Sequence, residues 1–168
     1  MSLKSAYDRA LSRVLAPFPG VPRWWAERSA RTRAQGPVPW APFTKRLSES
    51  RCAVITTGGF HLADQPEFDC DHGDPSFRAI PAGADLTRLH ITHTHYDTRD
   101  ARRDPNILLP LDRLRELVRE GALGSLAPTH YSLMGYIPQI EALVEETAPA
   151  MVEGLRREEV DFVLLTPA

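Results

Sequence analysis

The end of the chain places the strongest constraint on its fold. Residues 160–165, with the sequence VDFVLL, form a short and nearly unbroken apolar run that follows a helical pattern. Such a run predicts a strand of a parallel sheet that is buried on both faces. Pro167 ends this strand because proline has no N–H to donate. Ligands of open parallel sheets bind beyond the carboxyl ends of the strands, so we expect the functional site near Ala168.

The preceding residues alternate between strand and helix patterns. Strands are predicted at 52–57 and 89–92, and helices at 110–121 and 138–157, the latter with a break at Pro149. Strands that alternate with helices of this length indicate an α/β fold. We therefore predict a layered, Rossmann-like fold with a mainly parallel sheet over residues 51–168, and we expect this domain to be incomplete at its C-terminus.

The N-terminal residues 1–50 have a different character. Apolar residues recur at helical spacing over residues 3–15, and the following residues 17–42 are rich in proline, tryptophan and arginine. Prolines at this density oppose both helix and sheet, while tryptophans favour burial, so we expect a short helix followed by an irregular, extended arm. The arm also supports a non-enzymatic alternative, in which the chain is an interaction module that docks on a larger complex.

Composition narrows the class of protein. The chain has 168 residues, of which 42% are hydrophobic and 25% are charged, with a formal net charge of −2. No apolar stretch approaches the ~20 residues that span a bilayer. We expect a cytoplasmic protein with neither membrane nor nucleic acid as a partner. Cys52 and Cys70 match no zinc spacing, and we expect both to be inert and unpaired.

The sharpest local pattern is His93-x-His95-x-Asp97, which follows the predicted strand at 89–92. Imidazole and carboxylate groups suit zinc or iron, and the pattern resembles the first metal motif of the metallo-β-lactamase superfamily. That motif continues with a histidine where this chain has Thr98, and His130 is the downstream histidine that remains. A metal-dependent hydrolase is therefore one alternative. In the other, these side chains cap and tie down a loop.

Several segments together resemble the selenoprotein B family of glycine, sarcosine, betaine and D-proline reductases, in particular its short stand-alone members. The resemblance covers most of residues 37–168. It depends on the order and spacing of PWAPF (39–43), TGGFH (57–61), GDPSFRAIP (73–81), HTHYD (93–97), LPLDRLREL (109–117), GSLAP (124–128) and VLLTP (163–167).

The resemblance implies that a selenocysteine follows Ala168, with a cysteine three positions further on. The chain is then a fragment that ends at an in-frame UGA codon and lacks its catalyst. A selenol is mostly ionised at neutral pH, whereas an ordinary thiol with a pKa of ~8.5 is mostly protonated. The cysteine would resolve the selenium intermediate as a selenenyl sulfide, by the logic of thiol–disulfide exchange. No cofactor is expected within the 168 residues themselves.

The same resemblance implies an oxidoreductase, bacterial and cytoplasmic, that uses a disulfide as acceptor when full length. Its electrons come from a thioredoxin-like or other dithiol donor, and its substrate is an amino acid or an N-methylated derivative. A homo-oligomer or a reductase complex is expected. The residues predicted to orient substrate or transfer protons are His61, His93, His95, Asp97 and His130.

Overall fold

A computed structural model of the chain describes residues 6–8, 10–11, 14, 23 and 40–168. The described residues before position 15 are helical, and most of the predicted arm lies outside the described residues. The 3-10 helix η1 (Leu47–Glu49) leads into the first strand. No helix in the described part of the chain is long and apolar enough to cross a membrane.

The centre of the molecule is a five-stranded sheet. Its strands are β1 (Arg51–Thr56), β3 (Arg78–Pro81), β5 (Ser125–Leu126), β6 (Thr129–Ser132) and β7 (Phe162–Thr166). β1 pairs in parallel with β5 and β6 on one side and with β7 on the other, while β3 runs antiparallel to β6. The predicted α/β class and the mainly parallel sheet are confirmed.

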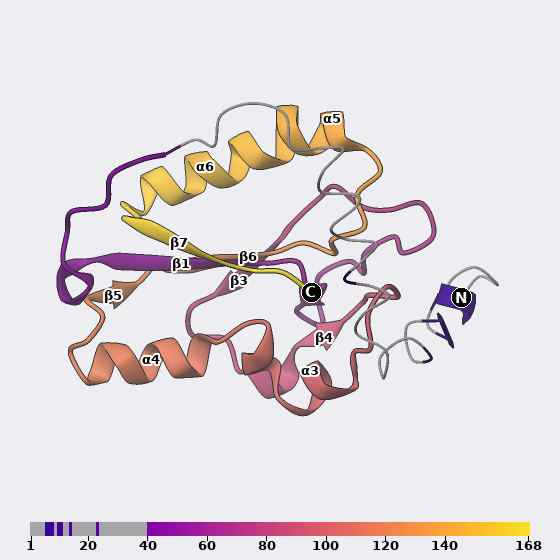
Figure 1. Ribbon diagram of the computed structural model, residues 1–168, viewed down its shortest axis with the longest axis horizontal. Helices are drawn as coiled ribbons and strands as arrows, with labels where there is room; N and C mark the ends of the chain where they lie inside the picture. The colour runs from indigo at the N-terminus through magenta and orange to yellow at the C-terminus, as the bar shows by residue number, and fades with distance from the viewer. Residues whose placement is uncertain (1–5, 9, 12–13, 15–22, 24–39) are drawn as a thin grey trace.

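Helices cover both faces of this sheet (Figure 1). One face carries α4 (Leu111–Arg119) and the short α3 (Arg99–Arg103), which is followed by η3 (Pro105–Ile107). The other face carries α5 (Ile140–Ala142), η4 (Leu143–Thr147) and α6 (Ala148–Arg157). Side chains alternate between the faces of a strand, so β1 sends Cys52 and Val54 into the core under α4 and Ile55 into the core under α6.

The predicted strand at 89–92 is present only in part and does not belong to the parallel sheet. β4 (His90–Ile91) pairs antiparallel with β2 (Phe60–His61) in a separate two-stranded ribbon. The 3-10 helix η2 (Leu86–Arg88) immediately precedes β4. The physical reason is that β2, which follows the turn at Gly59, is the strand that lies beside residues 90–91.

β7 is the outermost strand on one side of the sheet, and the prediction that it is buried on both faces is wrong. Among the described strands it pairs only with β1, and Leu164 and Leu165 are 37% and 67% exposed. An apolar run predicts a strand but does not reveal how many neighbours that strand has, because the neighbours come from distant parts of the chain.

The predicted break near Pro149 is present as a change from π-helix to α-helix, and not as an interruption of the helical backbone. The helical backbone is continuous from Ile140 to Arg157, and Pro149 lies in the first turn of α6, directly after a π-helical stretch at residues 143–147. Proline is tolerated in a first helical turn because the N–H that it lacks has no helical partner there. The π-helical stretch at residues 143–147 interrupts the α-helical hydrogen-bonding pattern, so α6 begins with a first turn of its own inside the longer helix.

A histidine closes a gap in the middle of the sheet. Cys52 pairs with Leu126 and Ile55 pairs with Tyr131, so two residues of β1 lie opposite four residues, 127–130, of the neighbouring chain. The ladder is interrupted at this bulge. The Nδ1 atom of His130 accepts the backbone N–H of Val54 at 3.0 Å, and the ring is fully buried. The imidazole thus supplies the acceptor that a backbone carbonyl provides elsewhere in the sheet.

Candidate active site at the carboxyl edge

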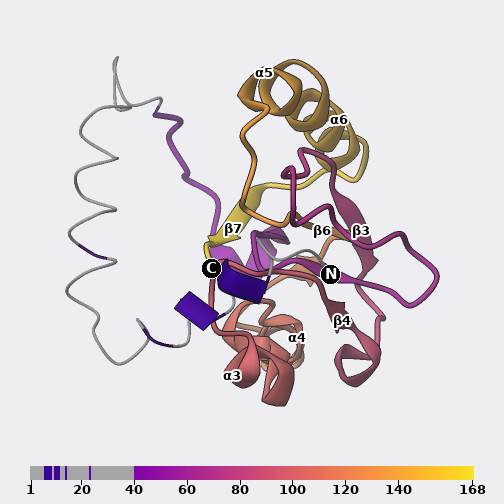
Figure 2. The same ribbon diagram turned by 90° about the vertical axis from the view of Figure 1, so that its right-hand side faces the viewer.

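The parallel strands β1, β6 and β7 end at one edge of the sheet, which faces the viewer in Figure 2. Three segments that follow these strands are joined there by hydrogen bonds. The N–H of Thr57 donates to the carbonyl of Thr166 at 3.1 Å, and the N–H of Gly59 donates to the carbonyl of Leu133 at 2.8 Å. The N–H of Ala168 donates to Thr57 Oγ1 at 2.9 Å. The last residue of the chain therefore lies at this edge, against the turn that follows β1.

Glycines allow the loop at residues 92–97 to approach this turn closely. Gly59 has a φ of +72°, and a Cβ atom there would collide with the carbonyl oxygen of Thr92. The Thr92 N–H donates to the Gly59 carbonyl at 2.9 Å, and the Tyr96 hydroxyl donates to the Gly58 carbonyl at the same distance. Glycines at the end of a strand allow a tight turn with close backbone approach, and both occur here.

His93 lies inside this loop cluster and is 5% exposed. Its Nδ1 atom accepts the backbone N–H of His95 at 3.0 Å, and the ring also hydrogen-bonds to the backbone of Met134. The pKa of His93 is lowered to about 4, mainly by burial and also by the nearby His95, against the hydrogen bond to Met134. His93 is therefore neutral at pH 7 and holds the loop to the segment that follows β6.

His95 is the histidine of this loop that solvent reaches. Its side chain is 34% exposed, and its ring stacks on Tyr136 with a centroid separation of 4.4 Å and an interplanar angle of 27°. Nδ1 lies 3.2 Å from Thr94 Oγ1, and Nε2 lies 3.7 Å from a carboxylate oxygen of Asp8. This arrangement fixes the plane of the ring while it leaves part of the imidazole open at the carboxyl edge.

The Asp97 carboxylate pairs with Arg99, the first residue of α3. Arg99 contacts its carboxylate through Nε at 2.9 and 3.0 Å and through Nη2 at 2.5 Å, and the Arg99 N–H donates to Oδ1 at 3.2 Å. Among the described residues, no three His, Cys, Asp or Glu side chains are grouped so that they could hold a metal ion. The geometry of His93, His95 and Asp97 supports the loop-tying alternative for this motif.

The other two predicted site residues lie apart from His95. His61 is 4% exposed, with Nε2 2.9 Å from Thr92 Oγ1 and Nδ1 2.9 Å from the Leu62 carbonyl oxygen. His61, in β2, is therefore joined to Thr92, which follows β4 at the start of the loop. His130 lies within the sheet, where it accepts the Val54 N–H. The positions of His61 and His130 favour structural roles for both side chains.

Sequence reasoning missed three contributors to this edge. Thr57 accepts the N–H of Ala168, Tyr136 stacks on His95, and Asp8 reaches the same imidazole from the N-terminal helical residues. The sequence signal for Tyr136 was its place after Gly135, whose φ of +84° brings that backbone against Thr57. No local signal pointed to Asp8, because its contact with His95 spans most of the chain.

Neither cysteine lies in surroundings that would make its thiol reactive. Cys52 is fully buried in β1, and burial raises the pKa of its thiol to about 11, against a smaller lowering by a backbone hydrogen bond to Leu164. Cys70 is 9% exposed and packs with Phe68 and Met134. Neither cysteine forms a disulfide within the part of the chain that the structure describes. A reactive sulfur or selenium at this edge would have to come from outside the described residues.

Comparisons with a family model and with individual proteins point to the same family. A model of the glycine/sarcosine/betaine reductase selenoprotein B family matches residues 26–168. The D-proline reductase subunit gamma of Acetoanaerobium sticklandii is 37% identical over 130 residues, which cover 77% of this chain and 53% of that protein. The glycine reductase complex component B subunit gamma of Symbiobacterium thermophilum is 34% identical over 133 residues, which cover 77% of this chain and 31% of that protein.

A further relative is the betaine reductase complex component B subunit beta of Peptoclostridium acidaminophilum, which is 32% identical over 127 residues, or 73% of this chain and 29% of that protein. No solved structure matches the chain. The chain thus spans about half the length of the D-proline reductase subunit and about a third of the other two relatives. The match over residues 26–168 includes the carboxyl edge described above, apart from Asp8, and the chain belongs to the glycine/sarcosine/betaine reductase selenoprotein B family.

Proposed function

We propose that this chain supplies the α/β framework of a selenoprotein-B-type reductase that acts on a small amino acid or an N-methylated derivative. The observation that carries the proposal is the meeting of Ala168, the turn after β1 and the His93–Asp97 loop at one edge of the sheet. The relatives support the substrate class, since they are named as reductase subunits for D-proline, glycine, betaine and sarcosine.

The redox group in this proposal is a selenocysteine directly after Ala168, with a cysteine three positions later. Reductive cleavage of a substrate C–N bond consumes two electrons and two protons, and forms one C–H and one N–H bond. The selenol and the thiol supply both and become a selenenyl sulfide. A thioredoxin-like or other dithiol then reduces the selenenyl sulfide and is itself oxidised to a disulfide. The hydrogen bond from Ala168 to Thr57 would hold the start of this segment at the carboxyl edge.

His95 is the residue that we propose for proton transfer or for orienting the substrate. It is partly exposed, its ring plane is fixed by Tyr136, and the Asp8 carboxylate lies 3.7 Å from Nε2. A positioned imidazole can donate a proton to the amine that leaves when the C–N bond breaks. His93, Asp97 and His61 would position this loop through their contacts with Met134, Arg99 and Thr92, and His130 would act only within the sheet.

The relatives are subunits of reductase complexes, so we propose that this chain also assembles with other subunits. Phe162 already receives the ring of Phe43 from the N-terminal side, with centroids 5.4 Å apart, and Trp40 is 85% exposed beside that segment. The exposed tryptophan supports the docking role that the arm suggested. This role accompanies the reductase proposal and does not replace it.

The decisive experiment begins with the nucleotides after the Ala168 codon. We expect a UGA codon, a continuing frame, and a cysteine codon three positions later. The selenocysteine-containing protein should then reduce glycine, sarcosine, betaine or D-proline with dithiothreitol as electron donor. A UAA or UAG codon, or a selenium-containing protein without dithiol-dependent turnover of any of these substrates, would contradict the proposal.

In that protein, His95→Ala is expected to lower kcat about 10²-fold to 10⁴-fold, the usual contribution of general acid–base catalysis. The matched control is His72→Ala, since the His72 side chain is 81% exposed on the loop before β3. Steady-state kinetics with the preferred substrate measures both variants. Turnover by His95→Ala equal to that of the control would remove His95 from the mechanism without affecting the family assignment.

A further inference from the structure

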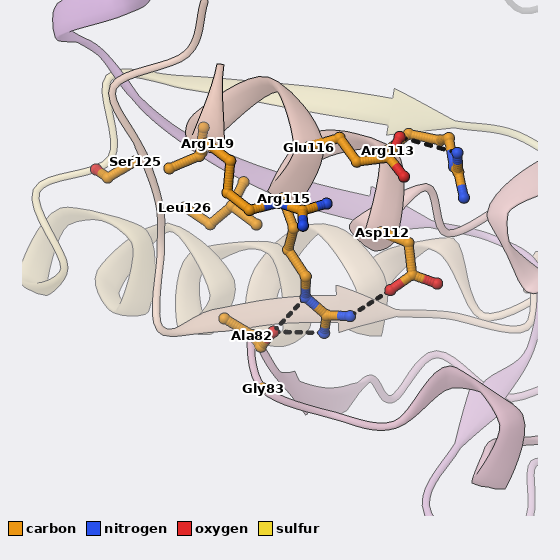
Figure 3. A pocket seen from close by; sticks show the side chains of 10 residues that line it. Ala82, Gly83, Asp112, Arg113, Arg115, Glu116, Arg119, Ser125 and Leu126 are labelled. Carbon is orange, nitrogen blue, oxygen red and sulfur yellow. Dashed lines mark hydrogen bonds and ion pairs between the residues drawn. The ribbon is translucent and has the colours of Figure 1, made fainter. Parts of the chain in front are cut away.

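A cavity of about 820 Å³ lies at the amino edge of the sheet, opposite the candidate active site (Figure 3). Its walls come from α4, from the start of β5 and from the turn after β3. The apolar part consists of Val118, Leu126 and Ala82, and the polar part consists of Asp112, Arg113, Arg115, Glu116, Arg119 and Ser125. The volume lies within the ~300–1,000 Å³ typical of small-molecule sites.

The charges that line the cavity do not cancel. Arg113 pairs with Glu116 at 2.8 Å, and Arg115 pairs with Asp112 at 2.5 Å. These pairs account for both carboxylates and for two of the three guanidinium groups. The Arg119 side chain has no ion pair or hydrogen bond with any residue of the described part of the chain, and it is one of the side chains that line the cavity (Figure 3). One unpaired positive charge therefore remains beside an apolar wall.

Arg115 gives the cavity a rigid side. Its guanidinium donates to the Ala82 carbonyl through Nε at 3.1 Å and Nη2 at 2.5 Å, and to the Ala84 carbonyl at 2.9 Å. These bonds, with the contact to Asp112, leave it little freedom to move. Arg119 lies four residues further along the same helix, where like charges repel each other by a few tenths of a kcal/mol. An anion between them would relieve this repulsion.

From this arrangement we propose that the cavity binds a small aliphatic carboxylate. The carboxylate pairs with Arg119, with the Ser125 hydroxyl as a further donor, and the hydrocarbon part lies on Val118 and Leu126. A single residual positive charge matches a monoanion. Phosphate fits less well, because it has no apolar part and its second charge would face Asp112 and Glu116. The proposal is independent of the reductase chemistry, since the two sites lie at opposite edges of the sheet.

The test is a titration of the isotopically labelled 168-residue chain, followed by NMR. Butyrate is the probe, 1-butanol tests the hydrocarbon part alone, and inorganic phosphate tests the charge alone. We expect butyrate to shift the backbone amides of Gly83, Ser125 and Leu126 in a saturable way, with a dissociation constant at least about tenfold lower than that of either other compound. No saturable shift of these amides with butyrate would overturn the proposal.

Arg119→Gln is expected to raise the dissociation constant for butyrate about tenfold or more, because it removes a charged hydrogen-bond donor. Arg156→Gln is the matched control, since Arg156 is likewise exposed in the last turn of a helix, α6, outside the cavity. Arg119→Lys, which keeps the charge, should retain most of the affinity. Equal losses in Arg119→Gln and Arg156→Gln would show that binding depends on overall charge and would overturn the site.

Discussion

Replacing Gly59 with alanine is expected to destabilise the folded chain by roughly 3 kcal/mol or more. Two costs combine at this position. The φ of +72° is unfavourable for a residue with a Cβ, and that Cβ would collide with the backbone carbonyl of Thr92. The carbonyl cannot move aside easily, because the N–H of Thr92 is hydrogen-bonded to Gly59 itself. Urea unfolding followed by circular dichroism measures the change in the free energy of unfolding.

Two other glycines separate these costs. Gly121 has a φ of +74° but open space around its Cβ position, so Gly121→Ala should cost only about 1 kcal/mol. Gly83 has neither a positive φ nor a neighbour within 4 Å, so Gly83→Ala should change stability by less than about 0.5 kcal/mol. A loss for Gly59→Ala no greater than that for Gly121→Ala would show that the loops at the carboxyl edge do not depend on the close approach.

The free energy of unfolding is expected to fall steeply as the pH drops from about 6.5 to about 4. The buried rings of His93 and His130 both have a pKa of about 4 in the folded chain, against 6.5 for an ordinary histidine. Burial is the main cause in each case, and Arg115 lowers the pKa of His130 further, against Glu158. Between these pH values the unfolded chain binds protons that the folded chain does not, so stability is complete above pH 6.5 and is lost below it.

The loss amounts to at most about 3 kcal/mol for each histidine. Protonation of His130 would place a proton on the Nδ1 atom that accepts the Val54 N–H, and so would break the bond that closes the gap in the sheet. Protonation of His93 would similarly break the bond from the His95 N–H. Low pH is therefore expected to destabilise the centre of the sheet and the candidate active site together.

His130→Asn tests this origin of acid sensitivity. The side-chain oxygen of asparagine can take the place of Nδ1 as the acceptor for Val54, but it does not titrate. We expect the variant to be less stable at pH 7, because it loses buried ring surface, and to show a flatter dependence of stability on pH between 6.5 and 4. The control is His90→Asn at an exposed histidine. Flattening of equal size in the control, or none in His130→Asn, would contradict this assignment.

The α/β class, the positions of α4 and β1, and the presence of Ala168 at the carboxyl ends of the parallel strands were all predictable from the sequence. Each depends on local patterns. α4 follows from apolar residues at helical spacing between Pro110 and Gly121, and the glycine pair after β1 follows from the conformations that only glycine adopts readily. The family resemblance was also legible, because it depends on the order of short segments along the chain.

The remaining features depend on contacts between distant residues. The apolar run in β7 is compatible with a central or an edge strand, and its pairing with β1 alone made it an edge strand. The dipeptide at 90–91 became part of an antiparallel ribbon because β2 was its available partner. His130 was a candidate catalytic residue by type, and only the unequal spacing between β1 and its neighbour turned it into a structural acceptor.

The sequence by itself determined the positions of β1, α4 and β7, because these depend on neighbours within a few positions. Only the tertiary structure decided that His93 is buried and neutral, that His95 lies partly exposed between Tyr136 and Asp8, and that the Arg119 side chain has no partner among the described residues beside a cavity. The reason is physical: burial, ion pairing and ring stacking are set by which distant segments pack together, and no local pattern records them.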